Sequence, residues 1–170
     1  ESNFVFIVDF LIHNDKIDVN SFDNEHKTSF YYACQYNYVE IVDLLLQNEK
    51  VDINIPDNEG KTPFCVACEN GFLNIVKRIL QRPEADLNTM SKSGSAFGLA
   101  VENWHHKVVQ ILIDSGKIIY QNEGEESPLH RACFRGNLKM VKLLFSIDSS
   151  KINKNEIDDI FIYFYRKEFS

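Results

Sequence analysis

The sequence predicts an all-α protein that folds as a solenoid of stacked helix pairs. The segment from Asp23 to Asn54 matches the segment from Asp57 to Asn88 at a constant offset of about 34 residues, which is typical of stacked supersecondary repeats. In the second half of each copy, apolar residues recur at positions i, i+3, i+4 and i+7, the spacing that places them on one face of a helix. Repetition and helical periodicity together indicate a row of helical hairpins with one shared apolar core.

About five copies of this unit account for most of the chain. Residues 1–20 match only the second half of a copy, whereas residues 21–54, 55–88 and 122–153 are full copies and residues 89–121 are a divergent one. Residues 154–170 fit no copy well, and we expect them to be a degenerate segment that caps the apolar end of the stack. We expect one domain, and, because the chain starts and stops inside the pattern, part of a longer protein.

Each copy predicts the same elements in the same order. A polar turn leads to a Ser or Thr, a strong helix N-cap, and a short first helix follows. That helix stops at Asn37, Gly71 or Gly136, which adopt the left-handed conformation readily. The third copy has Trp104 at this place, so we expect that repeat to be locally distorted or less stable. A second, amphipathic helix follows, and the copy closes on a turn asparagine. The N-caps are Thr28, Thr62, Ser95 and Ser127, and the closing asparagines are Asn20, Asn54, Asn88 and Asn153.

This order of elements resembles the ankyrin repeat. The second full copy carries Asp57, Gly60, Thr62, Pro63 and Ala67 of the family pattern, and the fourth reads Ser-Pro-Leu-His-Arg-Ala from residue 127. The resemblance implies an ankyrin-repeat α-solenoid with short β-hairpin loops. It also implies a non-catalytic scaffold that binds a protein partner through its concave face. An alternative is a targeting or regulatory fragment of a larger enzyme, channel or cytoskeletal assembly.

The composition argues against several other classes of function. The net charge of -7 disfavours nucleic-acid binding, which needs a surface rich in Lys and Arg. No apolar run approaches the roughly 20 residues of a membrane span. Four cysteines without a secretory signal favour a reducing, cytoplasmic setting. We therefore expect a protein partner, and neither a membrane, a small-molecule substrate nor a cofactor.

Cys65 and Cys68 form a Cys-x-x-Cys pair. This pattern leaves two chemical functions open, a redox dithiol or half of a metal site. A zinc site needs about four converging ligands, and no second pair lies in register. Cys34, Cys68 and Cys133 occupy one repeat position that Val101 fills in the third copy, as expected of a small buried apolar site. We therefore expect Cys68 in the core, whereas Cys65 replaces the histidine of the ankyrin pattern and is expected to be partly exposed.

The histidine pair after Trp104 has two interpretations. His105 and His106 are candidates for a metal site or a pH sensor. Consecutive helical residues point in different directions, however, which favours an ordinary turn at the solvent edge with the tryptophan partly packed.

The resemblance also implies which residues touch a partner, namely the hairpin tips and the exposed side of each first helix. The tips become more acidic towards the last repeat, so we expect a basic or polar partner there, with Tyr36, Phe134 and Arg135 as anchors. The full set is Asn24, Glu25, Lys27, Gln35, Tyr36, Asn58, Glu59, Lys61, Glu69, Asn70, Lys92, Glu102, Asn103, Trp104, Glu123, Glu126, Phe134 and Arg135.

Two closing asparagines carry a further hypothesis. Asparaginyl hydroxylases modify ankyrin repeats at an Asn that follows Asp-Val and has a Leu upstream. Asn54 and Asn88 lie downstream of Leu46 and Leu80 in a similar arrangement. A purely structural turn asparagine explains the same residues without modification.

Overall fold

The computed structural model describes residues 2–119 and 127–147. Helices and their connections make up almost all of this part of the chain, together with one two-stranded hairpin. The helices are α1 (Ser2–Ile12), α2 (Ser29–Gln35), α3 (Val39–Gln47), α4 (Pro63–Glu69), α5 (Leu73–Leu80), α6 (Ala96–Glu102), α7 (His106–Ser115), α8 (Pro128–Phe134) and α9 (Leu138–Leu144), and the strands are β1 (Met90–Ser91) and β2 (Gly94–Ser95).

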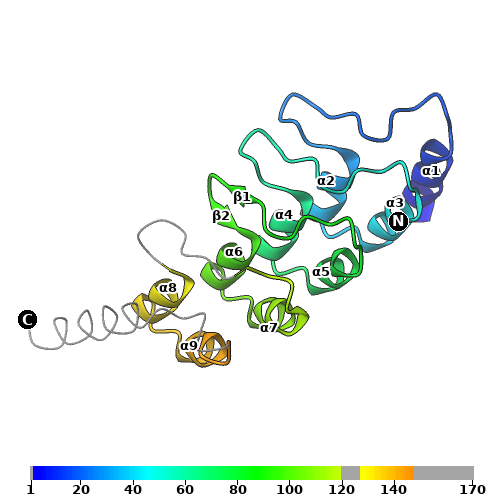
Figure 1. Cartoon of the computed structure of the whole chain (residues 1–170). Coiled ribbons are helices and arrows are strands. Elements are labelled where there is room, and N and C mark those ends of the chain that lie inside the picture. Colours follow the sequence, from blue (N-terminus) through cyan, green and yellow to red (C-terminus); the bar gives the residue numbers. More distant parts are fainter. Residues whose placement is uncertain (1, 120–126, 148–170) are drawn as a thin grey trace, which may run out of the picture.

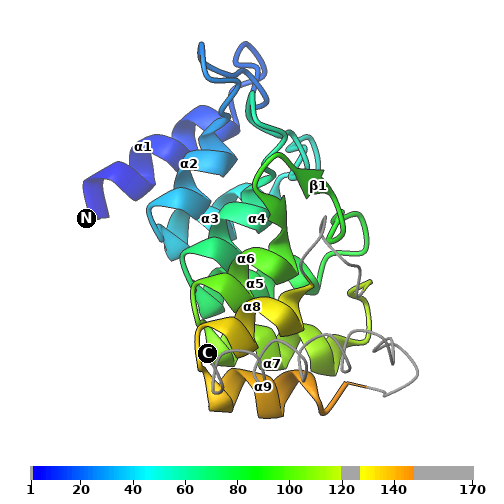
Figure 2. The ribbon, with the colours of Figure 1, turned by 90° about the vertical axis from the view of Figure 1, so that its left-hand side faces the viewer.

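The helices form two parallel rows (Figure 1). The inner row contains α2, α4, α6 and α8, and the outer row contains α1, α3, α5, α7 and α9; each helix packs on the next one in its row. Turning the molecule shows the repeats stacked in sequence order from the N-terminal end (Figure 2). The turns that precede the inner helices project from one side. The structure therefore confirms the all-α solenoid.

The first helices start where the sequence predicts. The side-chain oxygens of Thr28, Thr62, Ser95 and Ser127 each accept a hydrogen bond from the backbone N–H three residues later. Pro63 and Pro128 follow two of these caps, at a position where a missing N–H costs nothing.

All described first helices end in the same left-handed turn. The backbone φ is 59° at Asn37, 73° at Gly71, 63° at Trp104 and 68° at Gly136. Trp104 thus adopts the conformation of the glycines that it replaces, and α6 and α7 form as in the other repeats. The local distortion expected of the third repeat does not occur at this turn. Its lower stability remains a prediction, because a side chain in this conformation is strained.

The core runs between the two rows as one continuous cluster. Phe30, Phe64, Phe97 and Leu129 fill equivalent buried places in the inner row. Three residues after each of these large side chains lies a buried alanine, and its small side chain allows neighbouring helices to approach closely. The alanines are Ala33, Ala67, Ala100 and Ala132.

The closing asparagines link successive repeats. Asn54 Nδ2 donates to the carbonyl oxygen of Glu84 at 2.9 Å, and Asn54 Oδ1 accepts from the backbone N–H of Asp86 at 2.8 Å. Asn20 and Asn88 make the same two hydrogen bonds to the repeats that follow them. Each side-chain amide therefore acts as a bridge, a stronger role than the predicted local turn. The equivalent Asn153 lies outside the described residues.

Candidate protein-interaction surface

The concave face comprises the projecting turns and the exposed sides of the inner helices.

Two aspartates organise the first two turns. Asp57 Oδ1 accepts from the N–H groups of Glu59 and Lys61, both at 2.9 Å, and Asp23 does the same for residues 25 and 27. The turns also pair with each other, because Asn58 N donates to Glu25 O at 3.1 Å. This network fixes the backbone that presents the tip side chains to solvent.

The structure places most predicted tip residues at the surface, with two exceptions. Lys27 and Lys61 curl back onto their own repeats, and their side chains are only 17% and 12% exposed. Lys27 Nζ lies 2.6 Å from Glu25 Oε2, and Lys61 Nζ lies 2.9 Å from Glu69 Oε2. Both ammonium groups are therefore already neutralised within the chain. The exposed tip residues are Asn24, Glu25, Asn58, Glu59 and Lys92.

The ends of the inner helices combine exposed and internally bonded residues. Tyr36, Trp104, Phe134 and Arg135 are exposed, with Tyr36 at 56% and Phe134 at 57%. Gln35 is half-buried, and its Oε1 has no hydrogen-bond partner among the described residues. The side-chain amides of two further predicted residues bond back to their own helices. These are Asn70 and Asn103, which donate to Val66 O and Leu99 O.

The charge of the concave face differs between its two ends. In the first two repeats it carries Asp23, Glu25, Asp57 and Glu59, and only the two internally paired lysines oppose them. In the fourth repeat, Arg131 and Arg135 both lie within 3.4 Å of the carboxylate of Glu102. The acidic tip predicted for that repeat, with Glu123 and Glu126, lies outside the described residues. Among the described residues, the acidic end is therefore the N-terminal one.

Stacked tyrosines extend along the first inner helix, a feature that the sequence interpretation missed. The rings of Tyr32 and Tyr36 are parallel, with an interplanar angle of 2° and centroids 6.0 Å apart. Tyr38 continues the series, 5.9 Å from Tyr36. At the other end, Lys27 Nζ lies 5.9 Å from the centroid of Tyr32. The sequence did contain a signal for this feature, because four tyrosines fall within eight residues and two of them are four positions apart, on one face of a helix.

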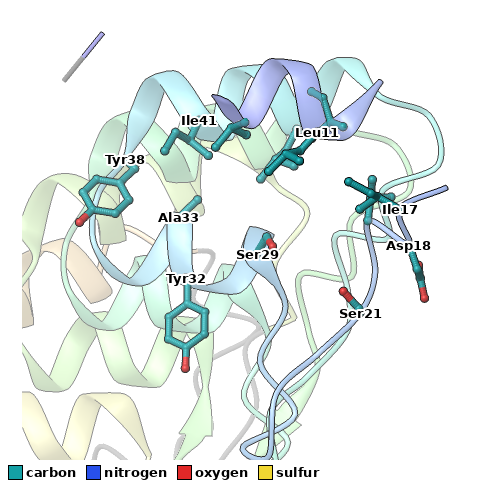
Figure 3. A pocket seen from close by; sticks show the side chains of 13 residues that line it. Leu11, Ile17, Asp18, Ser21, Ser29, Tyr32, Ala33, Tyr38 and Ile41 are labelled. Atoms are coloured by element: carbon teal, nitrogen blue, oxygen red, sulfur yellow. The ribbon is translucent and has the colours of Figure 1, made fainter. Parts of the chain in front are cut away.

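An apolar groove is lined by residues of α1, α2 and α3 (Figure 3). Leu11 of α1 and Ile41 of α3 face Ala33 and Ser29 of α2 across it in this view, and Ile17 lies at one end. A second groove adjoins the first and shares Val8, Tyr38 and Ile41 with it; we call it the Tyr38 groove. Its lining residues are Val5, Val8, Asn37, Tyr38, Val39, Glu40 and Ile41.

The cysteines are buried, which corrects one prediction. Cys68 lies in the core as expected, but Cys65 is only 1% exposed and not partly exposed. Its short side chain turns inward, where Thr62 Oγ1 donates to Sγ at 3.3 Å. Burial raises the pKa of the Cys65 thiol and, more strongly, that of Cys68. Such thiols resist the ionisation that redox chemistry and metal binding need. Among the described residues, no cluster of three metal-ligating side chains occurs.

The two histidines point to different repeats. His105 Nε2 lies 2.8 Å from the carbonyl oxygen of Glu69 in the preceding repeat, whereas His106 Nε2 lies 3.3 Å from Asn137 Oδ1 in the following one. Trp104 stays half-exposed between them. This arrangement agrees with the turn interpretation, and it adds a bridging role for each ring.

Comparison with known proteins agrees with this architecture. A family model for ankyrin repeats, with three copies, matches residues 1–91 and 83–158. The comparison with curated proteins found no match. Among solved structures, the chain is similar to an ankyrin repeat domain from Acinetobacter baumannii, with 22% sequence identity and a TM-score of 0.77, over 86% of this chain and 76% of that one. That likeness shows the fold, and the family model spans most of the sequence. The chain belongs to the ankyrin-repeat family.

Proposed function

We propose that the chain is a non-catalytic interaction scaffold that binds another protein through its concave face. Ankyrin repeats are generally protein-interaction modules, which is the coarse role that family membership supports. The observation that carries the proposal is the set of large side chains exposed at the ends of the inner helices: Tyr36, Trp104, Phe134 and Arg135. Tyr, Trp and Arg are enriched at the centres of protein interfaces, and backbone hydrogen bonds join the turn tips of successive repeats on the same face.

The charge of the surface indicates the kind of partner. The acidic residues of the first two repeats favour a partner with basic character at that end, because complementary charge speeds association. The same charge disfavours a nucleic-acid partner. No helix among the described residues is long and apolar enough to span a bilayer. A cytoplasmic location is part of the proposal, and the four free cysteines support it because thiols stay unpaired in a reducing compartment.

Two further roles stay open as proposals. The chain fits a targeting or regulatory part of a larger enzyme, channel or cytoskeletal assembly, since the ankyrin architecture alone does not fix a role. Hydroxylation of Asn54 or Asn88 also remains a prediction. Both side-chain amides bridge neighbouring repeats, which gives each asparagine a structural reason to be there without modification.

Affinity capture with matched variants tests the proposal. The wild-type chain and a Tyr36→Ala/Phe134→Ala double variant would be used to capture proteins from native lysate, with Phe145→Ala as the control. Phe145 is similarly exposed but follows the outer helix α9. We expect the double variant to lose a partner that the wild type and the control both retain. Capture of the same proteins by all three, with equal affinity after purification, would overturn the proposal.

A further inference from the structure

The outer row of helices, which is not part of the concave face, carries a groove across α5, α7 and α9. These helices pack side by side (Figure 1). Each contributes one apolar side chain that is half-buried against the core, namely Leu73, Ile111 and Leu143. The groove has a volume of about 650 Å³, which is room for several side chains of a ligand. We call it the lysine groove, and its lining residues are Leu73, Lys77, His106, Lys107, Gln110, Ile111, Asp114, Lys139, Lys142, Leu143 and Ser146.

Lysines border the apolar floor of this groove. Four exposed lysines line it, and Asp114 is the one acidic residue among its described lining residues. The lysines are Lys77, Lys107, Lys139 and Lys142. The first three each lie four positions from the apolar floor residue of the same helix, which places lysine and floor residue on one helix face. All three helices therefore present the same pair of groups, an ammonium and an apolar side chain.

The groove lysines are not neutralised within the described chain. None of them forms an ion pair with a described carboxylate. The carboxylate of Asp114 is occupied by the side-chain amide of Gln110, whose Nε2 donates to Oδ1 at 2.8 Å. Arg78 of α5 behaves differently, since its Nη2 donates to Asp43 Oδ2 of α3 at 2.9 Å. The outer row thus pairs the arginine internally, whereas the groove keeps its positive charge.

The charge of the outer row is segregated by repeat. At the repeat position of Lys77 and Lys142, α3 carries Asp43, and at the position of Lys107 and Lys139 it carries Glu40. A surface that serves solubility alone intersperses the two signs of charge. Here a chain with a net charge of -7 gathers lysines around one groove. Such a local field attracts and orients a ligand of opposite charge.

We propose that the lysine groove is a second binding surface, which takes an acidic segment of a partner polypeptide. Carboxylates of that segment pair with the lysines, and apolar side chains between them pack on Leu73, Ile111 and Leu143. A polypeptide suits the groove better than a nucleic acid or an anionic bilayer, because phosphates would use the lysines alone, leave the floor uncovered and meet the carboxylate of Asp114. The inference does not depend on the proposed function of the concave face, since it uses other residues. A chain with both surfaces joins an acidic partner to a second protein.

Peptide titration of the full chain tests the inference. The probe is the acetylated, amidated hexapeptide Asp-Leu-Glu-Asp-Leu-Glu. One control peptide has Asn and Gln in place of the acids, and the other keeps the acids and has Ser in place of Leu. The readout is the NMR shift of the methyl signals of Ile111 and Leu143. We expect the probe to shift these signals with an affinity about fivefold above that of either control, because it alone supplies both charge and apolar contact.

Matched variants separate the groove from general charge attraction. Lys107→Gln/Lys139→Gln and Lys16→Gln/Lys92→Gln remove the same charge from exposed side chains, but Lys16 and Lys92 do not line the groove. Substitutions at such surface positions leave the fold intact. We expect only the first double variant to weaken binding of the probe, about fivefold. Equal effects of the two double variants, or equal affinities for the probe and either control peptide, would overturn the inference.

Two further measurements test other occupants of the groove. The chain is mixed with vesicles of phosphatidylserine and phosphatidylcholine, and it is also sedimented alone. We expect neither vesicle binding nor a dimer that Lys107→Gln/Lys139→Gln abolishes. Either result would assign the lysines to a bilayer or to a second copy of the chain, and the acidic partner would be dismissed.

Discussion

The imidazole of His105 lies directly against Gly71, one repeat earlier. A Cβ atom placed on Gly71 would come within 2.4 Å of His105 Nδ1, while Nε2 of the same ring lies 2.8 Å from the carbonyl oxygen of Glu69. Gly71 is therefore needed for two reasons, its φ of 73° and the close approach of the neighbouring ring.

Substitution of Gly71 should consequently cost more than substitution of its counterpart Gly136. Gly136 has a similar φ of 68°, but no described residue lies within 4 Å of the position of a Cβ. We expect Gly136→Ala to lower the free energy of unfolding by about 1–2 kcal/mol, the strain of a left-handed alanine. Gly71→Ala should lose at least about 1 kcal/mol more, because overpacking displaces the His105 ring. Urea denaturation measures both, and equal losses would contradict the role given to His105.

Removal of an asparagine bridge should uncouple neighbouring repeats. Asn54→Ala deletes two hydrogen bonds to the next repeat, at 2.9 Å and 2.8 Å. At about 0.5–1.5 kcal/mol for each bond, the expected loss is about 1–3 kcal/mol of unfolding free energy. Asn24→Ala is the control, since its exposed side chain makes no hydrogen bond with described residues. A loss no larger than that of the control would show that the bridge contributes little.

The buried thiols should make the fold less stable at alkaline pH. Burial raises the pKa of Cys34, Cys65 and Cys68 in the folded chain, whereas in the unfolded chain a thiol ionises near pH 8.5, roughly its ordinary value. Above that pH the unfolded state binds fewer protons, so the free energy of unfolding should fall, by up to about 1.4 kcal/mol per thiol and pH unit.

Urea denaturation at pH 7.5 and pH 9.5 would measure that fall. Cys68→Val is the matched variant, because Val101 fills the equivalent place in the third repeat. We expect a smaller decrease in this variant. An identical decrease would assign the effect to other groups, such as Tyr31, whose pKa burial also raises.

Mass spectrometry decides whether the asparagines are hydroxylated. Peptides that contain Asn54 or Asn88, taken from the native protein, should gain about 16 Da if one oxygen is added. The same chain made in a host without such hydroxylases is the reference. Unshifted masses for both peptides of the native protein would dismiss the modification and leave the bridging role alone.

Most of the fold was predictable from the sequence because its signals are local and repeated. Thr62 and Ser127 predicted helix starts, and the apolar periodicity predicted the second helices. Trp104 was misjudged because its conformation follows from its neighbours. Its N–H donates to Val101 O and the next N–H to Ala100 O, as in the turn at Gly71, so the hydrogen bonds impose the left-handed turn whatever the side chain.

The candidate surface was less predictable because it depends on side-chain direction. Cys65 and Tyr31 occupy one repeat position and both are buried, although Tyr31 reaches across to Asp57 Oδ2 at 2.7 Å whereas the shorter cysteine stays within its own repeat and accepts a hydrogen bond from Thr62 Oγ1. Lys27 was expected at the surface, but a long side chain can fold back over apolar rings and a nearby carboxylate. Repeat position predicts where the backbone goes, whereas the contacts of each side chain decide how far it is exposed.

The asparagine bridges have a mechanical consequence. They run along the closing turns, while the backbone bonds from Asn58 to Glu25 and from Lys92 to Glu59 run along the tips. Two lines of directional bonds therefore follow the stack, and bending in the plane that contains both lines must stretch one of them. The distance between equivalent side chains of successive repeats is therefore held almost constant. A partner is then selected by the spacing of its own contact groups as well as by their chemistry.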